Sequence, residues 1–276
     1  MSRLRRAVGL PNIGEYADPR VVAELAALAE LNGWDGLFLW DHLVYDDQPV
    51  TDPQVAIAAA AAVTERITLG ICIVQLGRRR PAKVAREVAA LDQLSDGRMV
   101  LGVGLGSRAE DFADFGDDPD PVVRGRKTDE GLAVLAGLWT GEPFSFHGEH
   151  FRVEEVTFRP TPVQRPRVPV WVAGTWPARP GFRRAARWDG TFPTFRGLGH
   201  GDNVDPEVLG EAVDYVRRHR APDAGRFDVV LEGSTPGAPL DEYAAAGLTW
   251  WVEKLGWWRG DLDAVRRRIL AGPPAR

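Results

Sequence analysis

The stretch Gly36–Leu43, GLFLWDHL, carries one histidine directly after an apolar run. His42 follows a predicted strand, Gly36–Trp40, whereas the other four histidines fall in predicted loops, a hairpin or a helix. An imidazole at a strand end can transfer a proton or bond to a ring nitrogen of a ligand. His42 is therefore the candidate catalytic residue. The alternative is a structural histidine that Asp41 or the backbone satisfies.

Three glycines at alternate positions follow a second apolar run, in RMVLGVGLGSRAEDF. Gly104, Gly106 and Ala109 fit the G-x-G-x-x-A turn that binds dinucleotides. That turn belongs after a first strand and needs an acidic residue at the end of the next strand. Here it follows the fourth predicted strand, and residues 111–130 contain none. We favour glycines that let a flat ligand lie against bare backbone, with close strand packing as the alternative.

A third stretch, VPVWVAGTWPARPGF, could bind an anion. Gly174 and Thr175 follow a predicted strand and precede the predicted helix Phe182–Arg187. A hydroxyl group and free amides before a helix suit a phosphate, and Arg179 could add a bidentate contact. An ordinary turn between a strand and a helix is the alternative.

Aromatic side chains gather at or near the predicted strand ends. Trp40, Trp176 and Phe195 are the candidates for an apolar substrate pocket that keeps water from a reactive cofactor. Packing in the core is the alternative for such residues.

The elements that position these residues alternate regularly along the chain. Strands this apolar are typical of parallel sheets covered by helices on both faces. Eight strand–helix units without a linker predict one (β/α)8 TIM barrel over residues 1–276, and the length suits that fold. The predicted strands are Arg6–Leu10, Gly36–Trp40, Ile67–Val74, Met99–Leu105, Val168–Ala173, Thr191–Phe195, Phe227–Leu231 and Leu248–Val252. The predicted helices are Pro19–Leu31, Pro53–Val63, Pro81–Leu94, Lys127–Trp139, Pro206–His219 and Leu262–Leu270.

One segment interrupts the alternation. Residues 141–167 have no helical pattern and predict a hairpin, Phe144–Phe158, followed by a proline-rich arm. Because strand–helix alternation resumes at Val168, we interpret the segment as an insertion between strands four and five.

Composition limits the function classes. The 276 residues carry a net charge of −5 and one cysteine, and no apolar run is long enough to span a membrane. We expect a cytoplasmic protein without thiolate metal cages, with no nucleic acid or membrane as partner. The arginine runs 78–80 and 266–268 are interpreted as solvated faces.

Taken in order, these motifs resemble the bacterial luciferase-like flavin-dependent oxidoreductase family over roughly residues 6–195. The further motifs are AAAVTERITLGICIV, GLWTGEPFSFHGEHFRV, RPTPVQRPRVPVWVAG and FRRAARWDGTFP. The resemblance implies a luciferase-like TIM barrel that binds reduced FMN, or the deazaflavin coenzyme F420, at the carboxyl ends of its strands. It implies a small-molecule substrate, and as partners a flavin reductase and a second copy of the chain.

Site residues carry over by position. His42 matches a histidine near the reactive ring edge, and Cys72-Ile73 matches a non-prolyl cis peptide whose bulge supports the ring. Gly104 and Gly106 match glycines beneath the ring, and Gly174 and Thr175 match the start of the phosphate loop. Arg179 has no counterpart in this resemblance and is added to the predicted phosphate-binding residues because of its charge alone.

One departure limits the activity. Sugar-phosphate dehydrogenases of the deazaflavin group carry a glutamate where this chain has Ser107, so the resemblance argues against that activity. The expected function is a monooxygenase that uses reduced FMN and oxygen. The alternatives are F420-dependent hydride transfer and a non-catalytic flavin-binding barrel.

Overall fold

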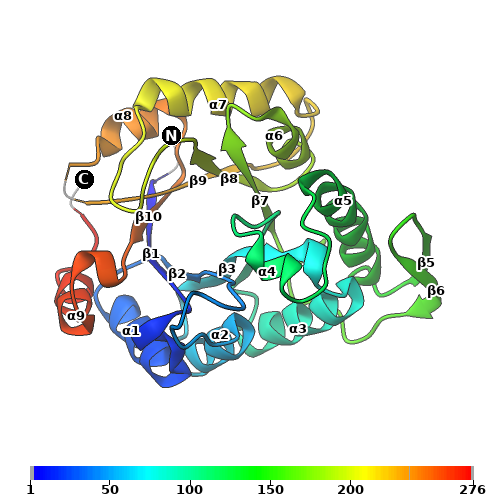
Figure 1. The fold of residues 1–276 in the computed structure, drawn as a ribbon, viewed down its shortest axis with the longest axis horizontal. Helices are drawn as coiled ribbons and strands as arrows, with labels where there is room; N and C mark the ends of the chain where they lie inside the picture. The colour runs from blue at the N-terminus through cyan, green and yellow to red at the C-terminus, as the bar shows by residue number, and fades with distance from the viewer. Residues whose placement is uncertain (1–2, 236, 275–276) are drawn as a thin grey trace.

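Eight parallel strands close a barrel in the computed structural model, which describes residues 3–235 and 237–274 (Figure 1). The order around the barrel is β1-β10-β9-β8-β7-β4-β3-β2. The strands are Arg5–Leu10 (β1), Gly36–Leu39 (β2), Thr68–Gln75 (β3), Met99–Gly104 (β4), Val170–Trp176 (β7), Gly190–Phe195 (β8), Asp228–Gly233 (β9) and Trp250–Lys254 (β10). The predicted luciferase-like barrel is confirmed, with strand ends shifted by up to three residues.

Helices follow the strands and cover the outside of the barrel (Figure 1). Four of the long ones begin alike, because an aspartate accepts hydrogen bonds from the first turn and a proline occupies the next position. The helices are Pro19–Leu31 (α1), Pro53–Ala62 (α2), Pro81–Leu94 (α3), Glu110–Ala113 (α4), Pro121–Leu138 (α5), Arg179–Ala185 (α6), Pro206–His219 (α7), Leu240–Ala246 (α8) and Leu262–Leu270 (α9).

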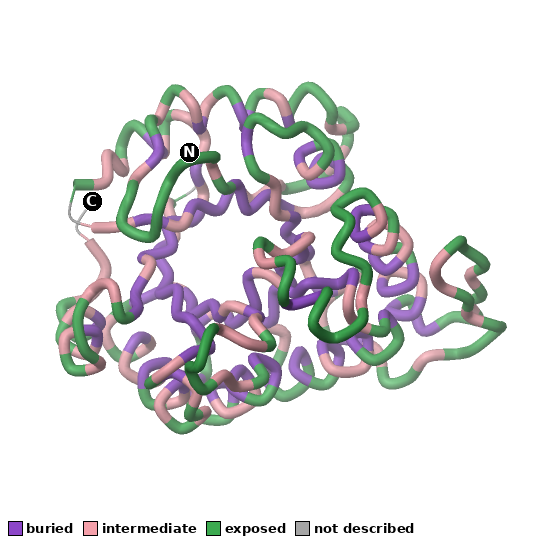
Figure 2. Tube along the Cα trace, in the orientation of Figure 1, coloured by how far each residue is buried: buried purple, intermediate pink, exposed green. Residues whose placement is uncertain are grey.

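The apolar core has two parts, which Figure 2 shows as a buried ring of strands with buried helix faces around it. Inside the barrel, Phe38, Trp171 and Trp250 meet edge to face with centroids 5.3 to 5.6 Å apart. Outside, the larger cluster joins the strands to helices such as α1 and α3. The filled interior makes the barrel a rigid support for whatever lies at its mouth.

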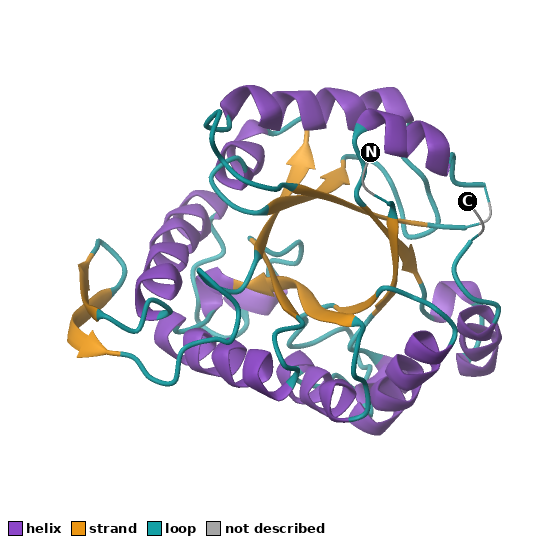
Figure 3. Ribbon diagram, turned by 180° about the vertical axis from the view of Figure 1, so that it is seen from behind, coloured by secondary structure: helices purple, strands orange, loops and turns teal. Residues whose placement is uncertain are grey.

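The predicted hairpin is confirmed as β5 (Pro143–His147) paired antiparallel with β6 (Arg152–Thr157). It stands away from the barrel beyond α3 and α5, as the view from behind also shows (Figure 3). β4 therefore pairs directly with β7.

Three sequence interpretations were incomplete or wrong. Helix α5 begins at Pro121 instead of Lys127, because Asp120 caps it. Helices α4 and α8 were not predicted, since each is too short to show a period. Arg78 and Arg79 do not form a solvated face, since their side chains are 3% and 15% exposed and both pair with Asp41.

Within the described part of the chain, no helix is both long and apolar enough to cross a lipid bilayer.

Candidate active site

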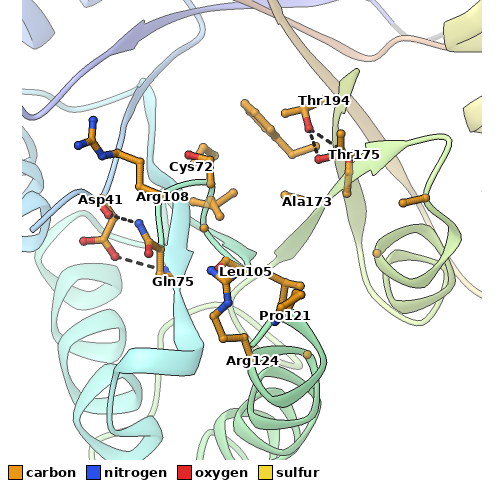
Figure 4. A pocket seen from close by; sticks show the side chains of 18 of the residues that line it. Asp41, Cys72, Gln75, Leu105, Arg108, Pro121, Arg124, Ala173, Thr175 and Thr194 are labelled. Atoms are coloured by element: carbon orange, nitrogen blue, oxygen red, sulfur yellow. Dashed lines mark hydrogen bonds between the residues drawn. The ribbon is translucent and has the colours of Figure 1, made fainter. Parts of the chain in front are cut away.

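A cavity of about 820 Å³ opens at the carboxyl ends of the barrel strands, the face at which barrel enzymes bind their substrates. Of the predicted site residues, the structure brings seven into its lining. These are Trp40, His42, Cys72, Ile73, Gly106 and the pair Gly174-Thr175. Figure 4 shows part of this wall, with Cys72 facing Thr175 and Thr194 across the opening.

His42 is held by a carboxylate that the sequence did not reveal. Its Nδ1 lies 2.8 Å from Oδ2 of Asp111, on α4, whose side chain is fully buried. Burial alone raises the pKa of Asp111. However, hydrogen bonds from His42, Gln75 and the N–H of Leu43 outweigh burial and hold that pKa well below its usual value. Because a carboxylate only accepts, His42 donates its Nδ1–H, which leaves Nε2 for a ligand in the cavity.

The backbone of His42 is fixed as firmly as its ring. Asn12 is completely buried, and its amide donates to the carbonyl oxygens of His42 and Thr51 at 3.0 and 2.7 Å. The N–H of His42 donates back to Asn12 Oδ1. The imidazole is thus positioned from both sides of the loop that follows β2.

Asp41 does not bond to His42, contrary to one sequence alternative. Its carboxylate binds Arg79 through two hydrogen bonds of 3.1 and 2.7 Å, and its carbonyl oxygen accepts from Arg78. Gln75 connects this group to the histidine, because its Nε2 donates both to the carbonyl oxygen of Asp41 and to Oδ2 of Asp111. Figure 4 shows the bonds between Asp41 and Gln75.

The expected bulge lies at the end of β3. The Cys72–Ile73 peptide bond is cis, and the pairing of β3 with β4 shifts register between Ile71 and Val74. Gly104 lies under the bulge and outside the cavity lining: a Cβ there would come within 2.2 Å of Cδ1 of Ile73. Gly104 therefore leaves room for the Ile73 side chain in the bulge.

Gly106 has a different role from Gly104. It lines the cavity with a φ of +80°, a conformation that favours glycine, and a Cβ there would meet the Gln75 amide at 2.4 Å. Its backbone turns the chain from β4 toward α4, the helix that carries Asp111.

The other end of the cavity lies between α5 and α6. Thr175 shares a hydrogen bond of 2.8 Å with Thr194, and both hydroxyl groups face the opening (Figure 4). Gly181 approaches Gly174 so closely that a Cβ would lie 2.7 Å from its Cα. Arg184 also lines this end, where it binds Asp129 and the carbonyl oxygen of Gly125.

Three predicted site residues lie elsewhere. The described residues that line the cavity do not include Trp176, Arg179 or Phe195. Trp176 packs outside the barrel against Phe182 and Tyr215, and the guanidinium group of Arg179 stacks on Trp176 and Tyr215 at 4.1 and 4.5 Å. Phe195 packs against the apolar cluster that contains Trp176 and against a neighbouring cluster that contains Trp251. Charge alone did not reveal this position for Arg179, because aromatic faces also attract a guanidinium cation.

Charged residues that the sequence analysis missed line the cavity beside Trp40. Glu232 on β9 and Lys254 on β10 form an ion pair of 3.1 Å, and Trp40 Nε1 donates to Glu232 at 3.3 Å. His200 stacks on Trp40 and on Trp258. Little in the sequence marked Glu232, Lys254 and His200 as site residues, since each is an isolated polar residue at a strand end or in a loop.

Comparisons with known proteins give a consistent family. The family model described as luciferase-like monooxygenase matches residues 5–274. An uncharacterized protein of Mycobacterium tuberculosis is 31% identical over 221 residues, covering 73% of this chain and 72% of the relative. The F420-dependent glucose-6-phosphate dehydrogenase of Gordonia bronchialis is 29% identical over 251 residues, covering 89% of this chain and 72% of the relative.

Solved structures share the fold. The coenzyme F420-dependent tetrahydromethanopterin reductase from Methanopyrus kandleri superposes with a TM-score of 0.78 at 17% identity, covering 98% of this chain and 99% of the reductase. The oxygenating constituent of 3,6-diketocamphane monooxygenase from Pseudomonas putida, in complex with FMN, gives 0.67 at 18% identity, covering 84% of this chain and 67% of that chain. Because the family model matches nearly the whole length of this chain, the chain belongs to the luciferase-like monooxygenase family.

Proposed function

We propose that this protein is an oxidoreductase that uses coenzyme F420 to exchange a hydride with a small alcohol or carbonyl compound. The observation that carries the proposal is the pair of His42 and Asp111 in the wall of the cavity. A hydride exchange at a carbon that bears oxygen also needs a proton moved at that oxygen, and an imidazole bonded to a buried carboxylate suits this task. The F420-dependent relatives support the same cofactor.

The residues of the cavity fit a flat cofactor with a phosphate group. Ile73, Ala173 and Phe192 give one part an apolar lining next to the bulge. At the other end, Thr175 and Thr194 offer hydroxyl groups, and the backbones of Gly174 and Gly181 lie close together without side chains. A volume of about 820 Å³ lies within the range of about 300 to 1,000 Å³ for ligand sites.

When bound, coenzyme F420 accepts or supplies the hydride. His42 Nε2 then takes the hydroxyl proton of an alcohol, or returns a proton to a carbonyl oxygen. Asp111 keeps the proton on Nδ1 and stabilises the positive charge of the imidazolium, because it lies 2.8 Å away and stays ionised. Asn12 and Gln75 hold this pair in position.

A second candidate is a monooxygenase that uses reduced FMN and oxygen. Trp40 and His200, which line the cavity and stack with Trp258, favour it, since such an aromatic cluster keeps water from a reactive cofactor. This activity would need a flavin reductase as partner.

Cofactor titration separates the two functions. We expect coenzyme F420 to bind about tenfold or more tightly than FMN when the cofactor fluorescence is followed on addition of protein. Tighter binding of FMN would favour the monooxygenase. The F420-loaded protein should then reduce the coenzyme with a panel of small alcohols, and His42→Ala should lower that rate by about 100-fold or more. A rate unchanged in His42→Ala would overturn the role of the histidine.

A further inference from the structure

We propose that the substrate is uncharged and carries a hydroxyl group on a carbon next to the reacting one, and that Glu232 and Lys254 bind this second hydroxyl together. The inference rests on the proposed function, because it names the substrate class of the same cavity. Its evidence is separate, since neither residue belongs to the pair that moves the proton.

Glu232 and Lys254 offer an acceptor and a donor side by side. Nζ of Lys254 lies 3.1 Å from Oε2 of Glu232, and both side chains line the cavity at 17% and 12% exposure. The ammonium group has three N–H bonds, of which Glu232 takes one. A hydroxyl group matches this pair, because it can accept from Lys254 and donate to Glu232 at once.

The pair lies next to the same side chain as the proton-transfer residue. Trp40 connects them: its ring centroid lies 6.0 Å from that of His42 and 5.3 Å from Nζ of Lys254, and its Nε1 donates to Glu232. On the barrel side, Glu232 is close enough to Cys72 to add to the effect of burial in raising the pKa of that thiol. His42 and the ion pair thus adjoin the same indole, that of Trp40.

Charge balance excludes an anionic group at this position. Glu232 cancels the charge of Lys254, and burial together with Lys254 lowers the pKa of His200. The neighbouring histidine therefore adds no cation at neutral pH. Arg108 lines another part of the cavity and pairs with Asp46 and Glu110. Beside Trp40, the described lining offers a phosphate or carboxylate the carboxylate of Glu232 and the ammonium group of Lys254, which Glu232 already pairs.

Stability does not explain the pair. Removing two charges from water costs more than a partly buried ion pair usually returns, and apolar residues of similar volume often stabilise a protein more. A costly pair that lines a cavity at the carboxyl ends of β9 and β10 is better explained by ligand recognition.

The test uses the F420-loaded protein and three probes of one shape: cyclohexanol, cis-1,2-cyclohexanediol and 2-hydroxycyclohexanecarboxylate. Binding is followed by the fluorescence of the bound coenzyme in the His42→Ala protein, in which the probes reduce the coenzyme about 100-fold more slowly. We expect the diol to bind about tenfold more tightly than cyclohexanol, because it gains hydrogen bonds to charged groups, and the carboxylate to bind more weakly than cyclohexanol. Lys254→Met should bring the affinity for the diol down to that for cyclohexanol. Lys83→Met, on the exposed outer face of α3, is the control.

The outcomes separate this inference from the proposed function. Absence of F420 binding by the wild-type protein would contradict the proposed function itself. Binding of F420 with no advantage for the diol, or with the carboxylate bound most tightly, would overturn the substrate class alone. If Lys254→Met no longer binds the coenzyme, Glu232→Gln decides, since it keeps the shape of the side chain and should still reduce the advantage of the diol.

Discussion

Nδ1 of His42 and Oδ2 of Asp111 lie 2.8 Å apart, although 69 positions separate the two residues in the chain. One follows β2 and the other lies on the short helix after β4, so the contact joins two loops across the end of β3. Asp111 also accepts from Gln75 and from the N–H of Leu43. The carboxylate therefore orients the imidazole and ties both loops to the barrel.

Replacing Asp111 should impair catalysis more than binding. We expect Asp111→Asn to lower kcat for coenzyme reduction by about 100-fold with a small change in KM, because the amide neither stabilises an imidazolium nor fixes the Nδ1 proton. Steady-state kinetics with F420 and a small alcohol measures this. Asp114→Asn, exposed one helical turn later, is the control. A kcat equal to that of the control would contradict a catalytic role for the pair.

The same carboxylate should make stability depend on pH in the acid range. The pKa of Asp111 is lowered in the folded protein, so its contribution is complete above the unfolded pKa of about 3.9 and is lost as pH falls toward the folded pKa. The difference in free energy of unfolding between wild type and Asp111→Asn should shrink as the pH falls below about 4. Denaturant titrations at each pH measure it. A difference that grows in acid would contradict the lowered pKa.

The barrel could be predicted from the sequence because local sequence patterns mark where its strands and helices begin. Aspartate-proline starts marked α1, α2 and α7, and their observed first residues agree with the prediction. The bulge at Cys72–Ile73 is also confirmed, but through family resemblance, since nothing in those two side chains predicts it.

The partners within the site could not be predicted, because they depend on contacts between distant loops. Asp111 lies in a helix of four residues that has no periodicity. Arg79 was interpreted as part of a solvated face, but its guanidinium group donates two hydrogen bonds to the carboxylate of Asp41. Trp176 and Phe195 end their strands with side chains outside the barrel, and a shift of one residue in such a strand reverses which face a side chain takes.

Arg179 should matter for stability and not for the cofactor. Its guanidinium group stacks on Trp176 and Tyr215, outside the cavity lining. We expect Arg179→Ala to lower the free energy of unfolding by about 1 kcal/mol, the range of a partly exposed cation–π contact, and to leave the affinity for F420 and FMN within twofold. Denaturant unfolding and fluorescence titration measure the two effects. A tenfold loss of cofactor affinity would restore Arg179 to the phosphate site.

Thr175 offers a direct test of the phosphate end. Its side chain is exposed at the cavity and bonds to Thr194, so a longer acidic residue fits without disturbing the core. A carboxylate about 4 Å from a phosphate costs roughly 1 to 4 kcal/mol, depending on the surroundings. Thr175→Glu should therefore weaken binding of F420 and of FMN by about tenfold. Thr157→Glu, exposed on the hairpin strand β6, is the matched control. Equal affinities in both variants would place the phosphate elsewhere.

The contact between Gly104 and Ile73 should control the shape of the bulge. A Cβ at position 104 would lie 2.2 Å from Cδ1 of Ile73 and 3.1 Å from Cβ of Ala173, so Gly104→Ala must displace the Ile73 side chain. We expect the substitution to cost about 1 to 3 kcal/mol of unfolding free energy, as overpacked cores do, and to weaken cofactor binding. Ile73→Val removes Cδ1, and the double variant should recover part of both losses because the two positions are in contact. Unfolding and cofactor titrations of the four proteins complete the cycle. Simple additivity of the two substitutions would mean that Gly104 does not act through Ile73.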